Sequence, residues 1–150
     1  MAFKLIRQVG GQTEASAYEM LGSGEILTGD VVQVLSTQAA VIRANSKEAS
    51  VTVSTIFAVA ASSTAAGASG TTMIKVIPIV SGQLWEADCA SNTATNQIMC
   101  RNLISSASVV TNSSTNTTTA LGVFLVYNYI GAVSDKKVIG EFIRNSSALV

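Results

Sequence analysis

The clearest strand in the sequence is the run TMIKVIPIV at residues 72–80. It is rich in β-branched residues, and a low-complexity loop of small residues, SSTAAGASGT at 62–71, precedes it. Ser81-Gly82 has the form of a two-residue turn, so Gln83–Ala87 is expected to return as the hairpin partner. Pro78 lacks an amide donor, which predicts a sheet edge or a bulge at that position.

Further strands are expected on both sides of this hairpin. Val31–Leu35 is β-branched and follows the tight turn Thr28-Gly29-Asp30, where glycine supplies a positive φ. The other expected strands are Ala39–Ala44, Val51–Ala61, Ala120–Tyr127 and Val138–Ile143. A single helix is expected over Thr93–Ile104, because Asn92 or Thr93 can cap it and its apolar residues fall largely on one side. The pattern predicts a mostly β fold, a compact antiparallel β-barrel or sandwich with one short helix.

The first residues are expected to stand apart from this fold. Residues 1–18 show no sustained period, and Gly10-Gly11 would break a helix. We therefore expect an extended N-terminal arm over 1–18, followed by a single β-rich domain over 19–150. A short apolar patch gives the arm something to bury on a neighbouring subunit; a partly disordered terminus or an edge strand is the alternative.

Composition excludes several classes of function. The 150 residues include nine basic and nine acidic side chains, only 12% charged residues and no histidine. Net neutrality argues against nucleic-acid binding, which needs a surplus of Lys and Arg. The lack of histidine rules out a Ser-His-Asp triad, a Cys-His dyad and a His-ligated metal within this chain. The apolar stretches are shorter than the ~18 residues of a membrane helix. We expect no enzymatic activity, no cofactor, no metal, no nucleic-acid partner and no membrane partner.

Two residue pairs could have either a chemical or a structural role. Glu86 and Asp88 are two apart in an expected strand, so they share a face and could form an acid–base pair; an acidic strand edge gives the same pattern. Cys89 and Cys100 lack the CxxC spacing of a zinc site. Free buried thiols are favoured for them over a disulfide.

The scarcity of charge points to contacts with other protein surfaces, since a neutral chain with few charges is poorly defended against association. The candidate interface residues are Phe3, Lys4, Leu5, Ile6 and Arg7 of the arm, together with Trp85. Tryptophan is enriched at interface hot spots. Core packing, with its indole N–H hydrogen-bonded, is the other interpretation of Trp85.

Three segments carry a likeness to a known family: GEILTGDVV at 24–32, KVIPIVSGQLWEA at 75–87 and LGVF at 121–124. Their order, over about residues 19–144, resembles the head decoration, or capsid cement, proteins of tailed bacteriophages. The resemblance implies a structural virion protein that binds the outer surface of a capsid lattice and cements neighbouring subunits. The implied partners are the major capsid protein and further copies of the chain, with a trimer favoured and a dimer possible. The implied location is the outside of the virion, after synthesis in the host cytoplasm.

Other functions stay open. A minor capsid, neck or tail protein keeps the structural role at another place, and electron microscopy of labelled particles would distinguish it. A coat subunit of a simpler virus would form shells by itself. A β-sandwich module for carbohydrate binding or adhesion would bind glycans through exposed aromatic side chains.

Overall fold

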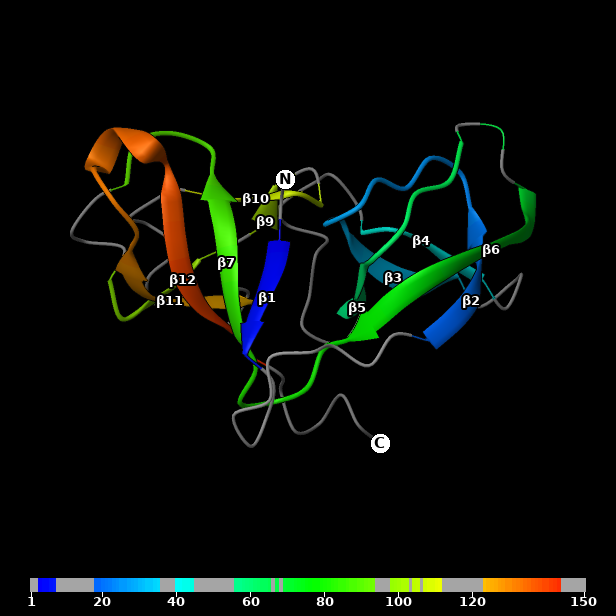
Figure 1. The fold of residues 1–150 in the computed structure, drawn as a ribbon, viewed down its shortest axis with the longest axis horizontal. Coiled ribbons are helices and arrows are strands. Elements are labelled where there is room, and N and C mark those ends of the chain that lie inside the picture. The colour runs from blue at the N-terminus through cyan, green and yellow to red at the C-terminus, as the bar shows by residue number, and fades with distance from the viewer. Residues whose placement is uncertain are drawn as a thin grey trace.

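The chain forms two β-structures that lie side by side, a closed five-stranded barrel and a seven-stranded sheet (Figure 1). This computed structural model describes residues 3–7, 18–35, 40–44, 56–65, 67, 69–93, 98–102, 104–105, 107–111 and 123–143. The prediction of a mostly β, largely antiparallel fold containing a barrel is confirmed. Both structures follow from alternating apolar and polar residues, which place every second side chain on one face of a strand.

The barrel closes in the order β2-β4-β3-β5-β6, with antiparallel pairs except that of β2 with β4. Its interior holds a cluster of buried apolar side chains, among them Val41, Ile74 and Val76. The expected turn before β3 is present, and Gly29 has a φ of +90° there. The strands are β2 (Tyr18–Ser23), β3 (Val31–Leu35), β4 (Ala40–Arg43), β5 (Ile56–Ala60) and β6 (Ser69–Pro78).

The seven-stranded sheet runs in the order β8-β11-β12-β7-β10-β9, and β1 pairs with β7 beside β10. The end strands β8 and β9 are separated by a single residue, 103, so the sheet curls until its two ends meet. A 3₁₀ turn, η5 (Val133–Asp135), joins β11 to β12. The strands are β1 (Phe3–Arg7), β7 (Leu84–Cys89), β8 (Cys100–Asn102), β9 (Ile104–Ser105), β10 (Val109–Val110), β11 (Phe124–Tyr129) and β12 (Lys137–Phe142).

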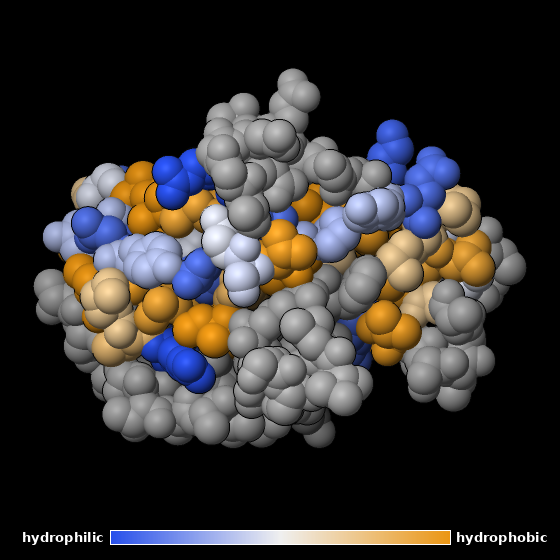
Figure 2. Space-filling model, turned by 90° about the horizontal axis from the view of Figure 1, so that it is seen from below, coloured by the Kyte–Doolittle hydropathy of each residue, from blue (hydrophilic) through white to orange (hydrophobic). Residues whose placement is uncertain are grey.

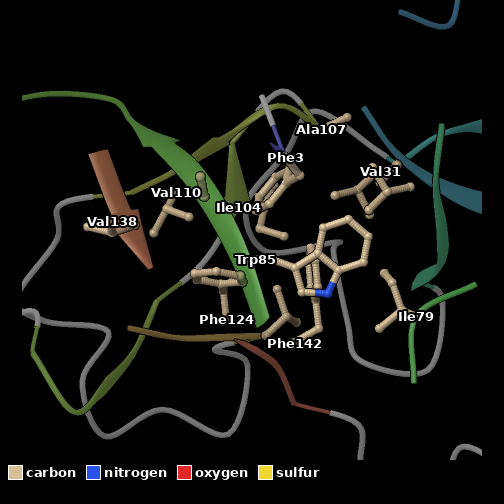
Figure 3. Close-up of a cluster of buried hydrophobic side chains, with 14 of the residues drawn as sticks. Phe3, Val31, Ile79, Trp85, Ile104, Ala107, Val110, Phe124, Val138 and Phe142 are labelled. Atoms are coloured by element: carbon tan, nitrogen blue, oxygen red, sulfur yellow. The ribbon is translucent and has the colours of Figure 1, made fainter. Parts of the chain in front are cut away.

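One hydrophobic core joins the two β-structures. Figure 3 shows Trp85 and Phe142 of the sheet close to Val31 and Ile79, which belong to the barrel and to the segment that leaves it. A backbone hydrogen bond also crosses this junction: the Val31 N–H donates to the Ala107 carbonyl at 2.8 Å. The shared core makes rotation of one β-structure against the other costly, since it would expose buried apolar surface.

The hairpin expected from residues 72–87 is wrong. Strand β6 pairs with β2 and β5 in the barrel, whereas β7 pairs with β1, β10 and β12 in the sheet. The turn between them therefore connects two β-structures rather than two hairpin arms. The buried Gln83 side chain holds it, accepting from the Val80 N–H at 2.9 Å and donating to the Pro78 carbonyl at 3.0 Å. Pro78 lies at the last position of β6, which fits its missing amide donor.

The helix expected over Thr93–Ile104 is also wrong for the residues that the structure describes in this range. Residues 94–97 and 103 lie outside the described ranges. Cys100–Asn102 is strand β8, paired with β11, and Ile104–Ser105 is β9. Met99 has a φ of +59°, which a right-handed helix does not allow. The apolar residues of this segment are compatible with a helix or a strand. Pairing with the edge of β11 favours the strand.

The expected N-terminal arm is extended, but it does not leave the body of the protein. Phe3–Arg7 is strand β1 and pairs antiparallel with β7 of the same chain, with Phe3 opposite Ala87. The Phe3 N–H also donates to the Gly29 carbonyl at 3.1 Å, which ties the strand to the barrel. The alternative of an edge strand is therefore the correct one for these residues; residues 8–17 lie outside the described ranges.

Candidate binding surface

A shallow cavity of about 240 Å³, with both polar and apolar walls, lies where the barrel meets the curled sheet. The barrel side contributes a buried carboxylate and its arginine partner, and the sheet side contributes a second carboxylate. Apolar and hydroxyl side chains complete the walls. The lining residues are Leu27, Thr28, Asp30, Arg43, Asp88, Ser108 and Val109.

Asp30 forms the barrel side of this cavity and is only 1% exposed. Its Oδ2 accepts from the Leu27 N–H at 2.8 Å and lies 2.8 Å from Nε of Arg43. Burial raises the pKa of the Asp30 carboxyl, and the Leu27 N–H and the Arg43 guanidinium act against that rise. Asp30 thus closes the turn that precedes β3 and holds the Arg43 side chain against it.

On the sheet side, Glu86 and Asp88 share one face of β7, as their spacing predicts. Lys137 of β12 bridges them, with Nζ 2.9 Å from Glu86 Oε1 and 3.2 Å from Asp88 Oδ1. The hydrogen bond to Glu86, followed by that to Asp88, raises the pKa of the Lys137 ammonium. The two carboxylates therefore act together as the anion for one lysine, which favours the structural interpretation of the pair over the acid–base one.

Two of the residues expected at an interface are buried in this chain's own core. Trp85 is 0% exposed, and its ring centroid lies 5.6 Å from that of Phe142. Phe3 is 3% exposed and contacts the rings of Phe124 and Phe142. Strand alternation turns both side chains toward the aromatic core, and their role in a contact with another protein stays a prediction.

The remaining arm residues lie nearer the surface. Lys4 and Arg7 are exposed, and Leu5 and Ile6 are half-buried. Lys4 stands directly opposite Glu86 on the outer face of the β1–β7 pair. Their role in a contact with another protein stays a prediction.

The indole N–H of Trp85 is buried and has no hydrogen-bond acceptor among the described residues. The core interpretation of this tryptophan carried the expectation of a bonded N–H, and that part is wrong. A buried donor without a partner costs about 1–3 kcal/mol, so the aromatic packing must outweigh this penalty.

Cys89 and Cys100 form no disulfide, as the sequence favoured. Cys89 is buried at the end of β7, and Cys100 is half-buried at the start of β8. The described residues include no cluster of three or more His, Cys, Asp or Glu side chains placed to hold a metal ion.

Several exposed apolar side chains of the described residues were not expected from the sequence. Figure 2 shows hydrophobic residues interspersed with polar ones on the face seen from below. Met73 on the barrel is 53% exposed and lies opposite Leu21, so the two form an outward apolar pair. Their period relative to the buried Ile74 and Val76 is the signal that could have found them. Within the described ranges, the exposed large apolar residues are Tyr18, Leu27, Val34, Met73, Val80, Met99 and Val133.

No family model matches this sequence, and no curated protein matches it. Among the described residues, none of the helical segments has the length and apolar character needed to cross a bilayer.

Proposed function

We propose that this chain is a structural virion protein that binds the outer surface of a phage capsid lattice and cements neighbouring subunits there. The resemblance over residues 19–144 gives the class of protein, and the fold supplies a body suited to the role. Its partners are the major capsid protein and other copies of the chain, with a trimer favoured. Its place is the outside of the assembled virion.

The observation that carries the proposal is the outward pair of Leu21 and Met73 on the barrel. Glu19 and Lys75, the next pair on the same outer face, border this apolar pair on one side with opposite charges. That is the arrangement of a protein–protein contact, in which an apolar centre is surrounded by a polar rim. With only 12% charged residues in the chain, few charges need to be desolvated when this face meets another subunit.

Rigidity and copy number support the same role. The barrel and the sheet share one core, so each copy can act as a stiff clamp rather than two loosely joined parts. Many copies on one lattice convert modest single contacts into a stable whole, because each further contact forms at high effective concentration.

The test is co-sedimentation of the purified chain with empty capsids of the phage that encodes it, in expanded and unexpanded forms. The proposal expects binding, with a preference for the expanded form. Met73→Ser should lower the bound fraction without lowering the melting temperature, and Thr72→Ser, at the adjacent exposed residue, should change neither. Wild-type chain that sediments with neither form would refute the capsid role, and labelled particles would then show whether it binds a neck or tail.

A further inference from the structure

The placement of β1 sets it apart from every other strand. The strands around it in the sheet, β7 to β12, all come from residues 84–142, whereas β2, the next strand in the chain, lies in the barrel. β1 pairs with β7 and with no other named strand. Its pairing partner and the rings beside Phe3 therefore come from the far half of the chain, and the barrel adds one bond, from the Phe3 N–H to the Gly29 carbonyl at 3.1 Å.

The site that β1 occupies beside β7, which we call its seat, is complementary to the side chains of Phe3 and Lys4. Phe3 fills a slot between two other rings, with centroids 5.5 Å from Phe124 and 5.0 Å from Phe142. The next residue, Lys4, lies opposite Glu86 and brings opposite charge to that pair. A strand that fits this seat must present an aromatic residue inward and a basic residue outward in succession, which the chain supplies at positions 3 and 4.

We propose that β1 is exchanged between copies, so that Phe3–Arg7 of one copy pairs with β7 of a second copy. The same backbone pairs and ring contacts form whether the strand comes from its own chain or from another. The two arrangements therefore differ in free energy by the connection to β2, by new contacts between copies and by the entropy cost of association, which makes exchange dependent on protein concentration. A strand donated from outside must come from a second copy of this chain, because the site complements this sequence at the aromatic slot and at the charged pair together.

Exchange makes Phe3 both a core residue and an interface residue. In an oligomer built this way, each copy contributes a ring to the core of the next, and the core is incomplete without it. The inference concerns contacts between copies and does not depend on capsid binding, so its failure leaves the proposed function standing, and the converse holds too.

Cysteine trapping tests the exchange. Two full-length chains, both with Cys89→Ala and Cys100→Ser, are co-expressed: one carries Lys4→Cys and a size tag, and the other carries Glu86→Cys. Directly opposed strand residues have Cα atoms about 4.5–5.5 Å apart, which lies within the range that a disulfide spans. Exchange predicts an interchain disulfide between the tagged and untagged chains on non-reducing gels.

A matched pair in the barrel is the control. Glu19 and Lys75 are also an opposed acid and base, but their strands β2 and β6 both lie inside the closed barrel. Glu19→Cys and Lys75→Cys on separate chains should give no interchain disulfide. Equal cross-linking in both mixtures would mean random collision and would overturn the exchange. The exchange would equally be overturned if the mixture gave no interchain bond while one chain carrying both Lys4→Cys and Glu86→Cys formed its bond internally.

Discussion

Replacing Phe3 by alanine provides the sharpest test of how the N-terminus is held. The sequence alone suggests little cost, because the third residue of an arm contributes nothing to a folded core. The structure instead buries this ring to 3% exposure, between Phe124 and Phe142. Truncating a buried phenylalanine costs about 3–5 kcal/mol, which includes the cavity left behind. A terminal strand can relax more readily than an internal one, so we expect a loss of about 3 kcal/mol in the free energy of unfolding.

Urea denaturation at one fixed protein concentration measures this loss, with Lys4→Ala as the control. Lys4 is exposed, so its truncation should change the free energy of unfolding by less than about 0.5 kcal/mol. For a chain of this size, 3 kcal/mol corresponds to a fall in melting temperature of roughly 6–12 °C. If Phe3→Ala is as stable as Lys4→Ala, the seating of β1 in the aromatic core is wrong.

Three further predictions follow from single sites. A Cβ at Gly140 would overlap the Leu125 carbonyl oxygen, so Gly140→Ala should lower the free energy of unfolding by about 2 kcal/mol or more. Gly67→Ala, where nothing lies within 4 Å, should be neutral in the same thermal melts. Arg43→Met leaves the Asp30 carboxylate buried beside an apolar side chain and should cost about 2 kcal/mol in urea. Adding Asp30→Asn should restore part of that loss, and a double-mutant cycle without coupling would contradict the pair. Burial, and then the hydrogen bond to the Glu141 carboxylate, raises the pKa of Tyr127 to about 12. Ultraviolet titration should therefore show one phenol still protonated at pH 11, where an unperturbed tyrosine is mostly ionised, and Tyr127→Phe should abolish that late step. Because the raised pKa disfavours the phenolate in the folded state, stability should fall as pH rises above 10, the ordinary tyrosine value, and Tyr127→Phe should reduce that fall.

The predicted strands show where local pattern suffices. Residues 31–35, 40–43 and 137–142 form strands close to the expected positions, because β-branched residues in alternation favour a pleated conformation with one buried face. The sequence also predicted correctly that Glu86 and Asp88 share a face, since residues two apart in a strand point to the same side.

Which side chains lie on the candidate surface was harder to predict from the sequence. The sequence marked Phe3 and Trp85 as contact residues by type, but which face of a strand meets a core depends on the sheet that receives it. Met73 and Leu21 lie outward for the same reason, and only their pairing across β2 and β6 brings them together. Asp30 and Arg43 are separated along the chain and meet because β3 and β4 pair in the barrel.

The sequence by itself determined that this chain is built from strands, has no net charge and only 12% charged residues, and contains no histidine, because these properties depend on composition and on local periodicity. The tertiary structure decided which strands pair. In it, β6 and β7 belong to different β-structures, and β1 packs against the aromatic core. Residues 100–102 form a strand paired with β11, and residues 104–105 form a strand paired with β10. Each of these outcomes depends on a partner distant in the sequence, and the free energy of pairing with that partner outweighs the modest local preference that a pattern can reveal.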